Sequence, residues 1–149
     1  MIEFHFSSPE ESPGFLLWQV TMLWQRRIKR ALAPLGITHT QFVLLAALGW
    51  LSEKEGTVTQ ARLADHSKTD RMMVSKVLRT LEGKGLLQRQ AHETDTRAKS
   101  LALTDQGRQL LQQAIKVVEN NDLEFFTVIE GGLSGFISNM QELMEKNAD

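Results

Sequence analysis

The sequence predicts a mainly α-helical fold with a small β-hairpin, arranged as a winged helix-turn-helix between two helical segments. Two short amphipathic helical patterns follow one another within residues 59–83. Two short strand patterns come next, within residues 86–103, and a polar segment separates them. Longer helical patterns lie on both sides of this unit. With 149 residues, the chain is long enough for one domain with its own core.

The first long pattern predicts a helix over residues 15–35, preceded by a polar arm. Apolar residues at spacings of three and four form one stripe on this helix. Four further apolar residues lie outside that stripe. We therefore expect the helix to be buried on two sides, with a partner subunit on the second side. The stripe comprises Leu17, Val20, Trp24, Ile28, Ala31 and Leu35, and the additional residues are Leu16, Trp18, Met22 and Leu23.

A second helix begins with a capping box, in which Thr38 is the N-cap and Gln41 is the third helical residue. Residues 52–56 are charged and predict a flexible loop after this helix. Residues 57–58 predict a short third strand beside the hairpin. Thr59 then caps the first helix of the helix-turn-helix, whose buried positions are Leu63 and Ala64.

The second helix of the motif has the pattern of a DNA-recognition helix. We expect Thr69 to be its N-cap, and one apolar stripe to face the core. Glycines at 83 and 85 predict its end. The opposite face is polar and basic, which suits contacts to bases and phosphates in a major groove, although a solvated surface helix would share this pattern. The stripe is Val74, Val77, Leu78 and Leu81; the predicted DNA contacts are Thr69, Arg71, Met72, Ser75, Lys76 and Arg79.

The hairpin carries the most specific signal. Strands are predicted over residues 86–90 and 99–103, with the polar stretch AHETDTRA between them. The series D-x-R-x-x-x-L-x-L-T-x-x-G resembles the wing of the multiple antibiotic resistance regulator (MarR) family. The segment LAPLGITHTQFVLLAAL is similar to the junction of that family's first two helices. The series is formed by Asp95, Arg97, Leu101, Leu103, Thr104 and Gly107.

This resemblance implies a transcriptional regulator, usually a repressor, that binds double-stranded DNA as a homodimer. The absence of export signals makes the cytoplasm its expected location. It implies a DNA-binding lobe over residues 37–104 and a dimerisation lobe over residues 12–36 and 105–147, within one domain spanning 1–149. We expect Asp95, Arg97 and Lys99 to contribute DNA contacts from the wing. The family also implies a small ligand between the first two helices and the DNA-binding lobe. Aromatic or phenolic acids are the first candidates, with Met22, Arg26, His39 and Phe42 as the predicted ligand-binding residues.

Two C-terminal helices complete the chain. The first is predicted over residues 105–126, capped by Thr104, and glycines at 131, 132 and 135 separate it from the last. These helices have too little chain around them to cover both of their faces. Their free apolar surface therefore favours dimerisation. The stripe of the last helix comprises Phe136, Ile137, Met140, Leu143 and Met144.

Composition limits the alternatives. The net charge is −1, but residues 60–100 hold nine Lys/Arg against five Asp/Glu, so positive charge collects in the predicted DNA-binding motif. No cysteine is present, so we predict no thiol chemistry. The histidines lack metal-ligand spacing, and we predict no bound metal and no cofactor. No catalytic motif, membrane span or signal peptide is evident. Two alternatives stay open: a winged-helix module that binds proteins without binding DNA, and an enzyme whose site is not recognisable.

Overall fold

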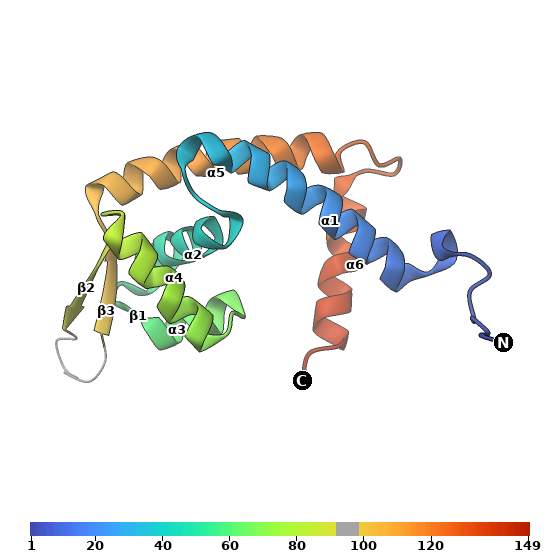
Figure 1. Ribbon diagram of the computed structural model, residues 1–149, viewed down its shortest axis with the longest axis horizontal. Helices are drawn as coiled ribbons and strands as arrows, with labels where there is room; N and C mark the ends of the chain where they lie inside the picture. The colour runs from blue at the N-terminus through green and yellow to red at the C-terminus, as the bar shows by residue number, and fades with distance from the viewer. Residues whose placement is uncertain (92–98) are drawn as a thin grey trace.

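The computed structural model describes residues 1–91 and 99–149 (Figure 1). The described chain is mostly helical, with one small sheet, as predicted. The elements in order are the 3₁₀ turn η1 (Pro9–Glu11), α1 (Pro13–Leu32), the 3₁₀ turn η2 (Ala33–Leu35), α2 (His39–Glu55), β1 (Val58–Thr59), α3 (Gln60–Ser67), α4 (Arg71–Gly83), β2 (Leu87–Ala91), β3 (Lys99–Leu103), α5 (Asp105–Phe126) and α6 (Leu133–Lys146).

Helices α1 and α5 pack side by side and form an arch (Figure 1). The helix-turn-helix and the sheet lie beneath one end of the arch, and α6 extends from the other end. The three strands are antiparallel in the order β1-β3-β2, so β3 is the central strand. Val58 of β1 pairs with Leu101 of β3, which confirms the third strand that the sequence predicts.

Helix α2 is the centre of the core. It contacts α1, α3, α4, α5 and the sheet, because leucines project from it on more than one side. This explains why α2 has no single apolar stripe. The capping box predicted at its start is confirmed: Thr38 N–H donates to Gln41 Oε1 at 3.0 Å, and Gln41 N–H donates to Thr38 Oγ1 at 3.1 Å. Its buried leucines are Leu44, Leu45, Leu48 and Leu51.

Several predicted boundaries are wrong by a few residues. The first helix starts at Pro13 and gives way after Leu32 to a 3₁₀ turn, because Pro34 disrupts regular helical bonding. Residues 52–55, predicted as a flexible loop, are the last turn of α2. The first hairpin strand starts at Leu87, one residue late, because Leu86 closes the end of α4.

The joint between β3 and α5 ties the end of α4 to the start of α5. Thr104 Oγ1 accepts a hydrogen bond from Gly107 N–H at 3.0 Å, which confirms its capping role. The same hydroxyl donates to Gly85 O at 2.6 Å, and Thr104 N–H donates to Leu86 O at 3.1 Å. The threonine and glycine of the predicted wing series are therefore the residues that close this joint.

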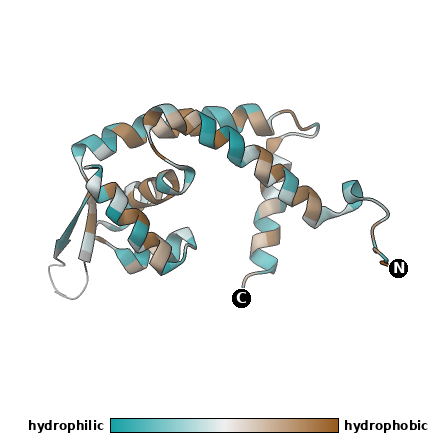
Figure 2. Ribbon diagram, in the orientation of Figure 1, coloured by the Kyte–Doolittle hydropathy of each residue, from teal (hydrophilic) through white to brown (hydrophobic). Residues whose placement is uncertain are grey.

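Large apolar surfaces are left uncovered at the opposite end of the arch. Within the described residues, α6 has no buried position, although it carries the predicted apolar stripe. Leu17 and Trp18 of α1 are 66% and 63% exposed, and Leu143 and Met144 of α6 are 63% and 74% exposed. Figure 2 shows apolar residues along these parts of α1 and α6. Contiguous exposed apolar surface of this kind marks an interaction site.

Among the described residues, no single helix is long and apolar enough to cross a membrane. The α1–η2 segment and α2 reach that length and composition only as a pair, and they are bent by 76° at their junction.

Candidate nucleic-acid interface

Both ends of α4 are fixed by hydrogen bonds. At the start, Asp70 Oδ1 accepts from Met72 N–H at 3.0 Å and from Met73 N–H at 3.1 Å. Asp70 is thus the N-cap, and the prediction of Thr69 is wrong: the Thr69 hydroxyl turns back and donates to Ser67 O at 3.2 Å. The charged Asp70 carboxylate accepts hydrogen bonds from two of the free N–H groups in the first turn of α4.

The end of α4 is closed by paired backbone hydrogen bonds. Leu86 N–H donates to Leu81 O, and Gly85 N–H donates to Glu82 O, each at 3.0 Å. Gly85 has φ = +76°, so it provides the left-handed residue that this type of cap requires. Gly83, the other glycine predicted to end the helix, is the last residue within it.

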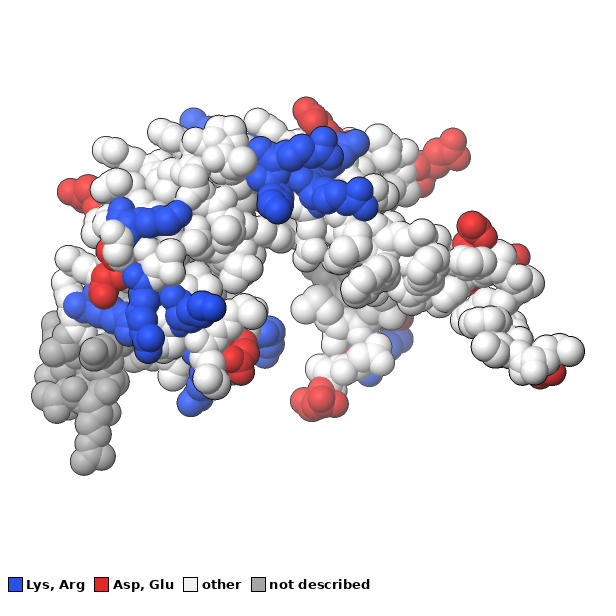
Figure 3. Space-filling model, in the orientation of Figure 1, with Lys and Arg blue, Asp and Glu red and all other residues white. Residues whose placement is uncertain are grey.

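The two faces of α4 divide as the sequence predicts. Val74, Leu78 and Leu81 are buried, and Val77 packs against the core while staying partly exposed. On the other side, the cationic and methionine positions are exposed and Ser75 is half-buried. Figure 3 shows lysine and arginine side chains gathered over α4. The exposed DNA-contact candidates on α4 are Arg71, Met72, Lys76 and Arg79.

Arg89 of β2 is a further residue at this interface, and it is not among the residues predicted from the sequence. Its side chain is only 16% exposed, and its Nε lies 3.8 Å from Glu82 Oε2. Its Nη2 donates a hydrogen bond to Ser75 O at 3.4 Å. Arg89 therefore connects the wing sheet to the middle and the end of α4. Strand alternation was the available signal, because Arg89 is two residues after the buried Leu87 and shares its face.

The wing candidates Asp95 and Arg97 lie outside the described residues. Lys99 is the first residue of β3, where its backbone pairs with Ala91 of β2. The hairpin register places Lys99 in the last strand pair before residues 92–98, at the end of the hairpin away from α4 and α5, and its contact with DNA stays a prediction.

The four predicted ligand-binding residues lie on α1 and in the first turn of α2. Met22 is half-buried and Arg26 is exposed on α1. His39 lies edge-on to Trp24, with 5.0 Å between ring centroids, and Trp24 Nε1 donates to Asp122 Oδ1 at 2.7 Å. Burial lowers the pKa of His39 below its ordinary value, while the Asp122 carboxylate opposes this shift. The imidazole is therefore biased towards its neutral form.

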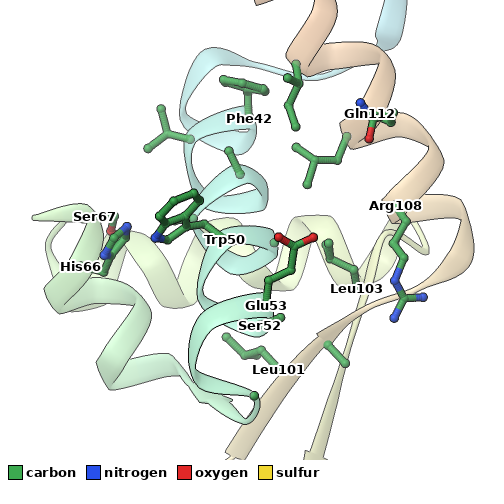
Figure 4. A pocket seen from close by; sticks show the side chains of 18 of the residues that line it. Phe42, Trp50, Ser52, Glu53, His66, Ser67, Leu101, Leu103, Arg108 and Gln112 are labelled. Atoms are coloured by element: carbon green, nitrogen blue, oxygen red, sulfur yellow. The ribbon is translucent and has the colours of Figure 1, made fainter.

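Phe42 belongs to a separate groove of about 1000 Å³ between α2, α5, β3 and the end of α3 (Figure 4). Phe42, Leu103 and Leu111 give the groove apolar walls. Glu53 and Arg108 bring charge to its edge. The other three predicted ligand residues are not among those that line it.

The amino-acid sequence matches a family model described as the ArnR1-like winged-helix domain over residues 35–120. The uncharacterized HTH-type transcriptional regulator YdcH of Bacillus subtilis (strain 168) is 44% identical over 146 residues, 97% of this chain and 99% of the relative. The fold is similar to that of MarR from E. coli complexed with operator DNA, with a TM-score of 0.77 and 22% identity over 95% of this chain and 97% of that one.

Another similar structure is BpsR of Bordetella bronchiseptica, with a TM-score of 0.81 and 22% identity over 99% of this chain and 100% of that one. It was solved to show how 6-hydroxynicotinic acid regulates BpsR's DNA binding. At these identities, the two structures establish only the fold of this chain. The family model and YdcH establish that the chain is related to winged-helix transcriptional regulators. The chain belongs to the MarR family of winged helix-turn-helix transcriptional regulators, and it is a DNA-binding regulator.

Proposed function

We propose that this protein is a homodimeric repressor that places two copies of α4 in successive major grooves of a pseudo-palindromic operator. The observation that carries the proposal is the outer face of α4, where Arg71, Lys76 and Arg79 are exposed while the inner face is buried. A dimer presents two such helices, which suits half-sites about one helical turn apart. In this proposal the protein acts in the cytoplasm by binding alone and catalyses no reaction.

A protein-binding winged helix without DNA binding is the alternative. It gives no reason for three cations on the outer face of α4, since an apolar or mixed surface would serve it equally well. DNA gives that reason, because phosphates attract cations and base edges accept hydrogen bonds from them.

The binding experiment measures fluorescence anisotropy on DNA from upstream of the protein's own gene, over a range of salt concentrations. Lys76→Ala should weaken binding and lower the slope of log K against log salt by about 0.9 for each phosphate contact removed. Lys116→Ala removes an exposed lysine from α5 and is the matched control, which we expect to leave the slope unchanged. Equal effects of the two substitutions would assign the binding to net charge rather than to α4.

Arg97 is proposed to provide the main DNA contact of the wing by entering an adjacent minor groove, with Asp95 orienting it. Arginine is planar, always charged and favoured in narrow A·T-rich minor grooves. Arg97→Ala should weaken operator binding without changing the melting temperature. Asp95→Ala should also weaken binding, although it removes a negative charge. Tighter binding by Asp95→Ala at every salt concentration would show that Asp95 does not orient Arg97.

A small aromatic or phenolic acid is the proposed effector, with Met22, Arg26, His39 and Phe42 as its proposed contacts. Binding there would change the spacing of the two α4 helices. Because the chain has no cysteine, this sensing is expected to be non-covalent and reversible. Titration with such acids should release the operator, and dialysis should restore binding. Release that persists after the acid is removed, in protein of unchanged mass, would contradict this mechanism.

A further inference from the structure

All the sulfur in this chain belongs to six methionines. Two of them, Met72 and Met73, are adjacent in the first turn of α4 and are 81% and 50% exposed. Their backbone N–H groups are both bonded to Asp70 Oδ1, so the turn that carries them is fixed. Their flexible thioether side chains extend into solvent from an ordered backbone.

Helix geometry places Met72 on the face proposed to bind DNA. Residues three, four and seven positions apart share one side of a helix, so Met72 lies in line with Ser75, Lys76 and Arg79. Met73 borders the same face, three residues before Lys76. The inference drawn here rests on the proposed function, since it requires this face to contact DNA.

The remaining methionines are less accessible or lie elsewhere. Met22 is half-buried on α1. Met140 and Met144 are in the apolar stripe of α6, which the proposed dimer covers, and Met1 is the first residue. Met1 is fully exposed, so Met72 and Met73 are distinguished by combining exposure with a position on the face proposed to bind DNA.

We propose that Met72 and Met73 form an oxidation site that switches DNA binding off. Hydrogen peroxide or hypochlorous acid transfers one oxygen atom to the thioether sulfur, giving methionine sulfoxide and water or hydrogen chloride. The sulfur is oxidised by two electrons and the oxidant is reduced by two. A sulfoxide reductase reverses the step: two thiols become a disulfide, and the oxygen leaves as water.

Oxidation changes the chemistry of the α4 surface in the direction that weakens binding. The thioether is apolar and suits contact with a thymine methyl group. The sulfoxide is polar, and its oxygen accepts hydrogen bonds but donates none, so it opposes the phosphates of DNA. It also competes with those phosphates for Lys76, which is four residues along from Met72. Desolvating this oxygen against base edges adds a further cost.

The test treats the full-length protein with a low molar excess of hypochlorous acid, maps the oxidised residues by mass spectrometry and measures operator affinity by anisotropy. Met72 and Met73, together with the fully exposed Met1, should be oxidised before Met22, Met140 and Met144. Affinity should then fall about tenfold or more, the size expected for the loss of one base contact. Methionine sulfoxide reductases of both stereospecificities, supplied with dithiothreitol, should restore it.

Variants assign the effect to the pair. After the same treatment, Met72→Leu/Met73→Leu should bind within about twofold of its own affinity before treatment, whereas Met144→Leu should lose affinity as the wild type does. If the double variant binds poorly before treatment, the two single leucine variants replace it.

Two results would overturn the proposal: unchanged affinity of protein shown to be oxidised at both positions, or a loss of affinity in the leucine variants equal to that of the wild type. Failure of the untreated protein to bind DNA would instead contradict the proposed function, so the two failures are distinguishable.

Discussion

Gly107→Ala is expected to destabilise the protein by about 3 kcal/mol or more. A Cβ atom built on Gly107 would lie 1.9 Å from the carbonyl oxygen of Leu86 and 2.8 Å from its carbonyl carbon. Both atoms belong to the backbone, and Leu86 O already accepts a hydrogen bond from Thr104 N–H. The clash can therefore be relieved only by opening the joint between β3 and α5, which also holds the end of α4.

The measurement is thermal unfolding at one fixed protein concentration, because dimerisation makes the melting temperature depend on concentration. A loss of this size should lower the melting temperature by roughly 6–12 °C. Gly83→Ala is the matched control: a Cβ at Gly83 meets no atom within 4 Å, and alanine favours helix by up to about 1 kcal/mol. A Gly107→Ala protein that melts with the wild type would show that this joint is not closed as described.

Leu143→Glu is expected to convert the dimer to a monomer and to weaken operator binding by about 10²–10⁴-fold. Leu143 is 63% exposed on α6, within the apolar stripe. A carboxylate there would be buried without a partner in the proposed interface, which is strongly unfavourable. Each monomer then binds one half-site alone and loses the advantage of binding both together.

Sedimentation at micromolar concentration should give twice the chain mass for the wild type and the mass of one chain for Leu143→Glu. Ser138→Glu adds the same charge to α6 at an exposed position away from the stripe, and it should stay dimeric. A wild-type protein that is a stable, folded monomer would overturn the proposed dimer. A Leu143→Glu protein that remains dimeric would place the interface elsewhere.

Patterns within single elements predicted much of the fold. The spacing of Val74, Leu78 and Leu81 identified the buried side of α4, and Thr38, Thr59 and Thr104 were correctly predicted as caps. These predictions succeed because helical periodicity and capping depend on residues only a few positions apart.

The predictions that failed depended on competition between neighbouring residues or on contacts distant in sequence. Thr69 and Asp70 are adjacent and both suit an N-cap, so only the observed bonds of Asp70 distinguish them. The contact of Arg89 with Ser75 joins residues 14 apart, across the turn between α4 and β2. The groove at Phe42 brings together four elements, and composition alone does not predict such a cavity.

The predicted DNA contacts and the predicted ligand contacts rest on different observations. The exposed cations of α4 support its proposed contacts directly, whereas Asp95 and Arg97 rest on the wing series alone. His39 lies against Trp24, and Phe42, three residues later on α2, lines the groove, whereas Met22, Arg26 and His39 do not line it.

A nuclease footprint on DNA flanking the protein's own gene shows whether two copies of α4 read one operator. We expect two protected half-sites related by a pseudo-two-fold axis, with centres about 10–10.5 base pairs apart or a multiple of that spacing. Lys76→Ala should lose protection at both half-sites together. Protection of a single isolated half-site, or no protection at concentrations where the protein is a folded dimer, would contradict the account.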